Sequence, residues 1–401
     1  RLVLVTGRAY PELAEKVAEC LGTEILETTS YDFANGEMYV RFTEPVRGAD
    51  VFVLQTHADL VNKSIMEQLI MIDALKRASA RSITAVCPLL GYSRQDKKHR
   101  GREPISCRLV FDLLKTAGAD RIMSVDLHAA QSQGFFDGPV DHLIAMPVLV
   151  DYIRDRFSNQ LDNVAVVSPD AGRIRVAEQW AQRLGGGPLA FVHKTRDITR
   201  PNQAVANRVV GDVAGKDCVL VDDLIDTAGT IAGACHVLQD AGAKSVTVVA
   251  THGVLSGPAV DRLKNCGARE VVLTDTVPIP EEKRWDGLTV LSIAPLLASA
   301  IRAVFEDGSV AELFDTYPEH HGQGFLFAPG LSPDEFSRRV GGDHIGRRRL
   351  GRAGQPVDGL PDRSPHGVGD IIGADPPGHQ KAECSSNQHQ LGAVLSQNIH
   401  Q

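Results

Sequence analysis

Residues 218–230, CVLVDDLIDTAGT, constrain the fold of this chain more than any other stretch. The apolar residues 218–221 lead directly into Asp222 and Asp223, then into a short polar loop and the mostly apolar segment IAGACHVL. A continuous apolar run followed by a polar loop and a helix is typical of a buried parallel strand with a crossover helix. Ligands of open α/β sheets bind at that end of a strand, so the stretch predicts an α/β fold with a site at this loop.

The loop after the two aspartates carries groups suited to a sugar phosphate. Gly229 lets a ligand approach the backbone, while the threonine hydroxyls and the amides at a helix start can hold a phosphate. Two adjacent carboxylates can accept hydrogen bonds from sugar hydroxyls or hold a metal ion. The alternative is that Asp226 and Thr227 form an ordinary helix N-cap and that both aspartates are solvated. The density of functional groups within nine residues favours the binding site.

The same succession of elements occurs twice in the chain. The pattern of residues 51–90 predicts a strand, a polar loop, a helix and a second strand that begins SITAV. Residues 218–252 repeat this order, and their second strand begins SVTVV. We interpret this as an internal duplication of one α/β unit. The first copy has QTHADLVNKS where the second has DDLIDTAGT, so it lacks the groups for a phosphate and a diol. We therefore expect two related domains, of which the second holds the sugar phosphate.

Composition separates the folded part from the end of the chain. We expect domains at residues 1–145 and 146–315, meeting near residues 143–150, and a disordered, low-complexity tail at residues 316–401, which is rich in Gly, Pro, His, Arg and Gln. The whole chain has 401 residues and a net charge of −8, which argues against nucleic acid as the main partner. No apolar run approaches the ~20 residues of a membrane span, and no signal peptide precedes the first strand, so we expect a cytoplasmic protein. The seven cysteines form no C-x-x-C pair and predict reduced thiols.

Two polar segments of the first half are candidate nucleotide contacts. In YDFANGEMYVRF, Asn35 and the glycine after it signal a hairpin, yet Phe33 could stack on a base while Asn35 and Glu37 read its polar edge. The pattern leaves these two interpretations equal. Residues 91–106 carry charges of both signs, which usually mark a solvated loop. Arg94 and Gln95 come directly after an expected strand, however, where a guanidinium could meet an anion.

Three further segments carry possible ligands of a metal or a phosphate. Asp126 and His128 follow an expected strand, and at the strand period of two they would share one face. The segment VAVVSPDAG places Asp170 at another strand end. After an expected strand at residues 189–193, a long polar loop carries Lys194 and Arg196, and such loops are often lids over active sites. Cations on a lid suit a reaction that develops negative charge on a phosphate chain.

Several motifs together make residues 1–315 resemble the ribose-phosphate pyrophosphokinase family: FANGE, SRQDKK, DLHAAQSQGFFD, VSPDAG, HKTRD and VDDLIDTAGT. The last motif is shared with phosphoribosyltransferases, whereas the others are specific to the synthetase family. The resemblance implies two tandem phosphoribosyltransferase-like (type I) domains, each a mainly parallel sheet flanked by helices. The chain departs from the family pattern at Cys107 and Ser132, and Asn35 stands where many members carry Asp.

The resemblance also implies a role for each motif. The 5-phosphate of ribose 5-phosphate would be held by Asp226, Thr227, Ala228, Gly229 and Thr230. The ribose hydroxyls and an associated magnesium ion would meet Asp222 and Asp223. ATP would be bound by Arg94, Gln95 and the adenine contacts Phe33, Asn35 and Glu37, with Phe33 supplied by a neighbouring subunit. A magnesium ion on the ATP phosphates would be held by His128 and Asp170, and the catalytic cations would be Lys194 and Arg196.

The implied reaction transfers the diphosphoryl group of ATP to the 1-hydroxyl of ribose 5-phosphate, giving 5-phosphoribosyl 1-diphosphate and AMP for nucleotide biosynthesis. Members of the family are homo-oligomers, hexamers built from dimers, with inorganic phosphate as activator and ADP as inhibitor. Two alternatives remain: a phosphoribosyltransferase, which shares the phosphate loop, and a catalytically silent, synthetase-like regulatory subunit. Because Lys194 and Arg196 are both retained, the silent subunit is the less favoured reading.

Overall fold

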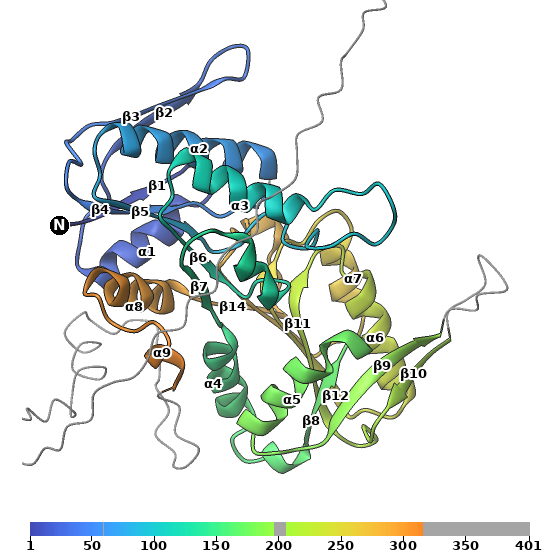
Figure 1. Cartoon of the computed structure of the whole chain (residues 1–401). Helices are drawn as coiled ribbons and strands as arrows, with labels where there is room; N and C mark the ends of the chain where they lie inside the picture. Colours follow the sequence, from blue (N-terminus) through green and yellow to red (C-terminus); the bar gives the residue numbers. More distant parts are fainter. Residues whose placement is uncertain (59, 196–205, 316–401) are drawn as a thin grey trace, which may run out of the picture. The chain divides into compact units, whose positions relative to one another are not determined.

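The computed structural model describes residues 1–58, 60–195 and 206–315, and two sheets dominate them (Figure 1). The first sheet has five strands, all parallel, in the order β1-β4-β5-β6-β7. Its strands are β1 (Leu2–Thr6), β4 (Asp50–Leu54), β5 (Ser82–Cys87), β6 (Arg121–Val125) and β7 (Val140–Leu143). Its helices are α1 (Pro11–Leu21), α2 (Val61–Arg77), α3 (Ser106–Ala117), the 3-10 helix η1 (Ala130–Phe135) and α4 (Met146–Arg156).

The second sheet has seven strands in the order β10-β9-β8-β11-β12-β13-β14. They are β8 (Val164–Ser168), β9 (Leu189–Thr195), β10 (Ala206–Val210), β11 (Asp217–Ile225), β12 (Ser245–Gly253), β13 (Glu270–Thr274) and β14 (Leu288–Leu291). The helices are α5 (Ile174–Arg183), α6 (Gly229–Asp240), α7 (Ala259–Asn265), α8 (Ala294–Phe305) and α9 (Glu312–Asp315), with the 3-10 helices η2 (Leu161–Asn163), η3 (Ala171–Arg173) and η4 (Glu281–Lys283). All pairs are parallel except β9 with β10.

The strand orders confirm the duplicated unit. The order β1-β4-β5-β6-β7 of the first sheet recurs as β8-β11-β12-β13-β14 in the second, and β4-α2-β5 corresponds to β11-α6-β12. The predicted domain limits remain a prediction, although the first sheet ends at Leu143 and the second begins at Val164. The predicted tail, residues 316–401, lies outside the described residues.

The core explains why the strands are apolar throughout. Successive strand residues point to opposite faces, and both faces are covered. On one face of the first sheet Val3 and Val5 pack with α2 and α3, and the second sheet packs in the same way with α6 and α7. The other faces of both sheets share one core, which includes Leu4, Val219, and residues of α1, α4, α5 and α8. The two halves are therefore joined by apolar packing.

The helices of the two halves are exchanged across this shared core. Helix α8, which follows the last strand of the second sheet, packs against α1. Helix α4, which follows the last strand of the first sheet, packs against α5 (Figure 1). At the end of α1, the Nη2 group of Arg302 on α8 donates to the carbonyl oxygens of Cys20 and Leu21, at 3.3 and 3.2 Å. A cation there stabilises the negative end of the helix dipole. Helix α1 ends before Gly22, which is left-handed at φ 68°.

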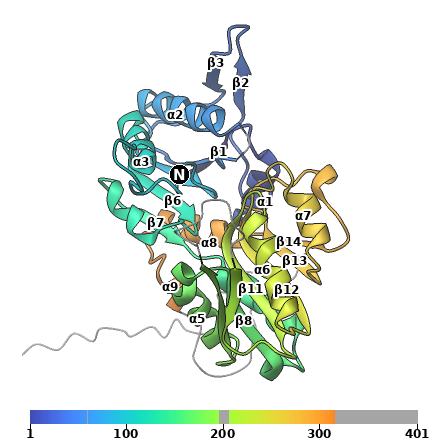
Figure 2. The ribbon, with the colours of Figure 1, turned by 90° about the vertical axis from the view of Figure 1, so that its right-hand side faces the viewer.

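Two hairpins lie outside the repeated strands. Strands β2 (Thr28–Asp32) and β3 (Met38–Phe42) form a separate two-stranded antiparallel sheet, which confirms the hairpin predicted there. Figure 2 shows this hairpin extending beyond α2. The long polar loop predicted after residue 193 is wrong in part, because β9 continues to Thr195 and β10 pairs with it. The alternating residues of the segment ANRVV suit such an edge strand. None of the helices described in the structure is long and apolar enough to cross a membrane.

Candidate active site

The two aspartates predicted at the strand end lie inside the structure. Strand β11 pairs with β8 on one side and β12 on the other, and its first five residues are buried. The side chains of Asp222 and Asp223 are 13% and 11% exposed. The alternative that these carboxylates are solvated is therefore wrong. Buried carboxylates require partners, because removing an unpaired charge from water is costly.

Their main partner is Arg173, which the sequence analysis did not identify. This residue ends η3, the short helix that follows β8. Its Nε lies 3.2 Å from Oδ1 of Asp222, and its Nη2 lies 2.7 Å from Oδ2 of Asp223. The same Oδ2 is 2.8 Å from Nδ1 of His128, which comes from the loop after β6 in the other half. A pair of carboxylates is thus held by one guanidinium and one imidazole.

These contacts separate the proton affinities of the two carboxyl groups. Burial, and then the neighbouring Asp223, raise the pKa of Asp222 to about 8. Burial also opposes the charge on Asp223, but the hydrogen bond from His128 and the charge of Arg173 outweigh it and lower the pKa of Asp223. The pair therefore holds one firmly charged carboxylate beside one that readily takes a proton, and both can accept hydrogen bonds from hydroxyls.

The start of α6 is open for an anion. Ala228 precedes the helix with a left-handed φ of 59°, and no side chain caps the helix. The ordinary N-cap predicted as the alternative for Asp226 and Thr227 is therefore wrong. Asp226 instead pairs with Nη2 of Arg94 at 2.8 Å, and the carbonyl of Thr227 accepts from Nη1 of Arg262 at 2.8 Å. The first amides of a helix have no intrahelical acceptor and attract phosphate.

The loop, the acidic pair and the contributing strands surround one cavity of about 230 Å³. Ten of the predicted site residues line it: Arg94, His128, Asp170, Asp222, Asp223, Asp226, Thr227, Ala228, Gly229 and Thr230. A second cavity of about 540 Å³ lies at the end of β4 and β5 and shares Arg94 and Leu224 with the first. Gln95 lines this second cavity, and its Oε1 accepts from Ser106 Oγ at 2.7 Å.

One expectation about the first half is wrong. Asp126 and His128 do not share a face, because β6 ends at Val125 and Asp126 has a positive φ of 39°. Oδ2 of Asp126 accepts from the amide of Ala145 at 3.2 Å and from the hydroxyl of Thr251 at 2.5 Å. The turn at Asp126 directs His128 the other way, toward the acidic pair.

The remaining predicted residues lie elsewhere. Phe33, Asn35 and Glu37 belong to the turn between β2 and β3 and line neither of the two cavities. Lys194 is a residue of β9, and Arg196 lies outside the described residues.

A magnesium ion fits the donors of the first cavity only with help from a ligand. Among the described residues, no three His, Cys, Asp or Glu side chains are grouped as a complete metal cage. Oδ1 of Asp170 accepts from the amide of Gly172 at 2.8 Å, and this carboxylate lines the cavity. Magnesium keeps several waters and binds through one or two carboxylates plus substrate phosphates. Asp170 suits such a site, whereas the imidazole of His128 is a less usual magnesium ligand.

Comparison with known proteins gives one consistent result. Residues 2–118 match the N-terminal domain of ribose phosphate pyrophosphokinase, and residues 193–315 match the phosphoribosyl synthetase-associated domain. A ribose-phosphate pyrophosphokinase of Bifidobacterium longum is 93% identical over 327 residues, which are 82% of this chain and 96% of that protein. The protein of the same name from Corynebacterium efficiens is 64% identical over 314 residues, 78% of this chain and 96% of its own length.

A solved structure agrees with these relatives. The crystal structure of phosphoribosylpyrophosphate synthetase from Mycobacterium smegmatis has 62% sequence identity and a TM-score of 0.73, covering 77% of this chain and all of that one. Because 327 matched residues exceed the 315 that carry the motifs, the similarity to the Bifidobacterium protein extends into the predicted tail. The chain belongs to the ribose-phosphate pyrophosphokinase family.

Proposed function

We propose that this chain transfers the diphosphoryl group of ATP to the 1-hydroxyl of ribose 5-phosphate, which gives 5-phosphoribosyl 1-diphosphate and AMP. The observation that carries the proposal is the cavity of about 230 Å³ with a mostly buried acidic pair at one side and an uncapped helix start at the other. A diol can bind at the acidic pair while a phosphate binds at the helix start. The relatives named for this activity, at up to 93% identity, support the same reading.

In this proposal ribose 5-phosphate lies across the loop after β11. The amides of loop 226–230 at the start of α6 and the hydroxyls of Thr227 and Thr230 hold the 5-phosphate. Asp222 and Asp223 accept hydrogen bonds from the ribose hydroxyls, and Arg173 keeps the two carboxylates in place. The sugar is thereby oriented with its 1-hydroxyl toward the nucleotide, which lowers the entropic part of the barrier.

ATP binds beside the sugar, at Arg94 and Gln95. Arg94 lies at the junction of the two cavities, where a guanidinium can contact both substrates. The adenine is held by Phe33, Asn35 and Glu37 of a neighbouring subunit. This assignment is supported by the position of the hairpin, which lines neither cavity of its own chain although Phe33 is 46% exposed. The functional protein is therefore a homo-oligomer, a hexamer by family resemblance.

The reaction is an in-line displacement on the β-phosphorus. The 1-hydroxyl oxygen forms a bond to this phosphorus, the bond to the bridging oxygen of the α-phosphate breaks, and AMP leaves as the hydroxyl proton is lost. Asp170 and His128 would hold magnesium, which neutralises phosphate charge when bound. Lys194 and Arg196 neutralise charge that develops in the transition state. We further propose a cytoplasmic enzyme that inorganic phosphate activates and ADP inhibits.

A coupled assay tests the proposal. Purified full-length protein with ATP, magnesium and ribose 5-phosphate should release AMP with no nucleobase present. A phosphoribosyltransferase would release none under these conditions and would instead consume 5-phosphoribosyl 1-diphosphate when a base is added. A silent regulatory subunit would do neither. Either of these last two results would refute the proposed reaction.

A further inference from the structure

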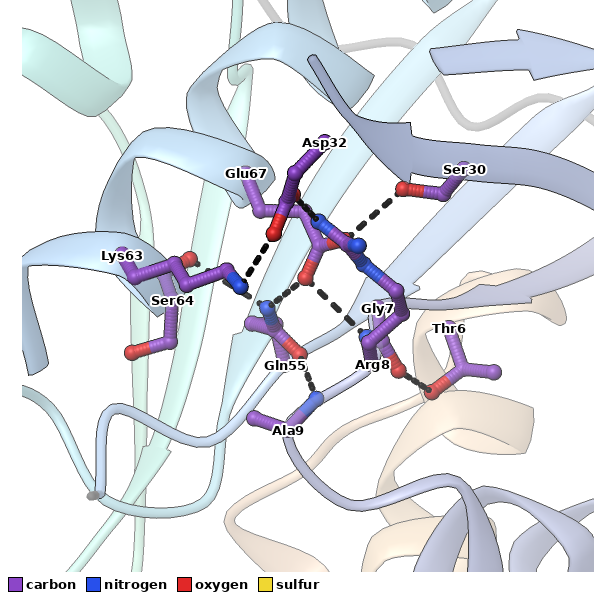
Figure 3. A network of polar contacts seen from close by, with 10 residues as sticks. All are labelled: Thr6, Gly7, Arg8, Ala9, Ser30, Asp32, Gln55, Lys63, Ser64 and Glu67. Atoms are coloured by element: carbon purple, nitrogen blue, oxygen red, sulfur yellow. Dashed lines mark hydrogen bonds and ion pairs between the residues drawn. The ribbon is translucent and has the colours of Figure 1, made fainter. Parts of the chain in front are cut away.

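A buried carboxylate in the first half makes contacts that the proposed reaction does not use. The side chain of Glu67, on α2, is 3% exposed and is surrounded by donors (Figure 3). Its Oε2 accepts from the amide of Arg8 at 3.0 Å and from Nε2 of Gln55 at 2.7 Å. Its Oε1 accepts from Nε of Arg8 at 2.5 Å and from the hydroxyl of Ser30 at 2.9 Å. Four hydrogen bonds to one buried carboxylate are strong and geometrically specific.

These contacts connect α2, the segment after β1 and the segment after β4 to the β2–β3 hairpin. Arg8 follows β1, Gln55 follows β4, and Ser30 lies on β2 (Figure 3). The other end of the Arg8 guanidinium binds Asp32, with Nη2 2.7 Å from Oδ1. Lys63 of α2 binds the second oxygen of Asp32 at 2.5 Å. Ser30 and Asp32 are two residues apart, so both side chains point from the same face of β2 into the network.

The network ends directly before the turn of the hairpin. Phe33 follows Asp32, and its amide donates to the carbonyl of Glu37 at 2.7 Å while its carbonyl accepts from the amide of Gly36 at 2.8 Å. Tyr31 and Tyr39 stack across the hairpin with ring centroids 4.9 Å apart. The turn is ordered by its own contacts, but β2 and β3 pair with no further strand among the described residues. Its direction therefore depends on how its base is attached.

The base of the hairpin is attached on its two strands in different ways. Val40 and Phe42 of β3 pack against the apolar core between the first sheet and α2. Such contacts are not directional. Ser30 and Asp32 of β2 are instead held by hydrogen bonds of fixed geometry. Ser30 binds Glu67, and Asp32 binds Arg8, the partner of Glu67, and Lys63 of α2. The polar network therefore fixes the orientation of the β2–β3 hairpin, which apolar packing alone would leave variable.

The corresponding positions of the two halves hold their buried carboxylates in different ways. In the second half, Arg173 follows the first strand and meets the two carboxylates of the second strand, β11. In the first half, Arg8 follows the corresponding strand β1, but the second strand β4 is followed by Gln55, which is neutral. The carboxylate that meets Arg8 comes from the helix instead. The end of β11 in the second half thus faces a ligand cavity, whereas the residue after β4 in the first half, Gln55, binds the side chain of Glu67.

We propose that Glu67 is a positioning residue for ATP: it orients the β2–β3 hairpin, through Arg8 and Ser30, so that Phe33 meets the adenine bound to a neighbouring subunit. This inference rests on the proposed adenine contact of Phe33. Glu67 acts as an anion, because its hydrogen bonds from Arg8, Ser30 and Gln55 outweigh burial and lower its pKa. It lines neither substrate cavity and touches no substrate directly.

Glu67→Gln in the full-length protein tests the proposal. The amide keeps the size of the side chain but replaces one accepting oxygen by an NH2 group, where Arg8, Gln55 and Ser30 donate to the carboxylate. We expect the KM for ATP to rise about tenfold, the size of a partial loss of base stacking. The kcat and the KM for ribose 5-phosphate should stay within about twofold, because the contacts of the transition state are intact. Hydrogen exchange of the amides at residues 30–38 should become faster. A variant that is merely destabilised would lower kcat and leave both KM values unchanged.

Two further variants keep the test decisive if Glu67→Gln folds poorly. Ser30→Ala removes the direct bond between the hairpin and Glu67 and should raise the KM for ATP in the same direction with faster exchange. Asp73→Asn on the same helix is the matched control, because the side chain of Asp73 is 47% exposed and, among the described residues, pairs with Arg77, four residues on. The control should leave both KM values and the exchange of the hairpin unchanged. An unchanged KM for ATP in both Glu67→Gln and Ser30→Ala would overturn the proposal.

A double-mutant cycle separates this inference from the adenine contact on which it rests. In a Phe33→Ala background, Glu67→Gln should add no further increase in the KM for ATP, because Glu67 affects ATP binding through the position of the Phe33 ring. An independent, multiplicative increase would overturn the positioning role. If Phe33→Ala alone leaves the KM for ATP unchanged, the adenine contact itself fails and the proposal with it. If Phe33→Ala raises the KM but the hairpin amides of Glu67→Gln exchange as in the wild type, the anchoring alone is refuted.

Discussion

The buried imidazole of His57 predicts a specific loss of stability in mild acid. His57 follows β4 and is 1% exposed. Its Nε2 lies 2.8 Å from Oε1 of Gln68, which has no proton to give, so Nε2 donates. Its Nδ1 accepts from the amide of Gly91 at 3.1 Å. Protonating Nδ1 would place two N–H groups against each other, and the ring is therefore held neutral in one tautomer.

The size and sign of the effect follow from the proton affinity of the ring. Burial lowers the pKa of His57 from its ordinary 6.5 to about 4, against the hydrogen bond to Gln68, which raises it. Between these two values the unfolded chain binds a proton that the folded chain does not, so stability falls as the pH falls. At about pH 5 the loss from this ring is about 2 kcal/mol, and below pH 4 it reaches about 3 kcal/mol.

Urea denaturation of the wild-type protein and of His57→Gln, at about pH 7.5 and about pH 5, measures this acid-induced loss of unfolding free energy. The fluorescence of the buried Trp180 reports unfolding. The variant is expected to be less stable at both pH values, but the acid-induced loss should be about 2 kcal/mol smaller than in the wild type. The partly buried ring of His142 and the buried ring of His252, whose pKa values burial also lowers, contribute equally to both proteins. Protomer concentration must be constant, because assembly adds stability.

His236→Gln provides the matched control, since His236 is an exposed position of α6. It should keep the full wild-type difference between the two pH values. If His57→Gln loses as much stability in acid as the wild type, the neutral, buried ring does not govern the response and the reasoning is refuted.

Three other outcomes are expected. Arg173→Met should lower the free energy of unfolding by about 2 kcal/mol, because two adjacent carboxylates lose their cation; urea denaturation measures this, and the loss should shrink in an Asp222→Asn background. Lys194→Ala should lower kcat about a hundredfold with the KM for ribose 5-phosphate nearly unchanged, and AMP release at normal turnover would remove Lys194 from the chemistry. Chelation of magnesium should abolish AMP release and added magnesium should restore it; activity that survives chelation would exclude the metal from the reaction.

The sequence predicts most where one local pattern decides the structure. The apolar residues before Asp222 are forced into a buried strand, because a run without polar alternation must be covered on both faces. Gly22 ends α1 by a local rule of the same kind, since a left-handed φ costs Gly little. The repeated order of strand, loop and helix predicted the second sheet from the first. These elements need no information from distant parts of the chain.

The parts that sequence reasoning missed depend on contacts between distant segments. Arg173 and Arg175 both follow the VSPDAG motif, and only the fold brings one of them to the carboxylates of β11. The strand pattern predicts that Asp126 continues β6, whereas the structure has a turn there. The hydroxyl of Thr251 that holds this turn lies 125 residues away, so the local sequence does not indicate it. The exchange of α4 and α8 between the halves likewise depends on the shared core. A sharper signal was available at Asp126, since Asp is among the residues that tolerate a positive φ.

The corresponding ends of β11 and β4 line a ligand cavity in the second half and join an internal polar network in the first half. In the second half the strand end presents two carboxyl groups, which Arg173 holds beside a cavity of about 230 Å³. In the first half Gln55 is neutral and bonds to Glu67, and a Cβ atom at Gly7 would lie only 2.3 Å from Oε1 of Gln55. No ligand can enter a position packed so closely. The carboxylates of the second half follow the strand and line a cavity, whereas the carboxylate of the first half lies on helix α2, is enclosed by donors and holds the hairpin.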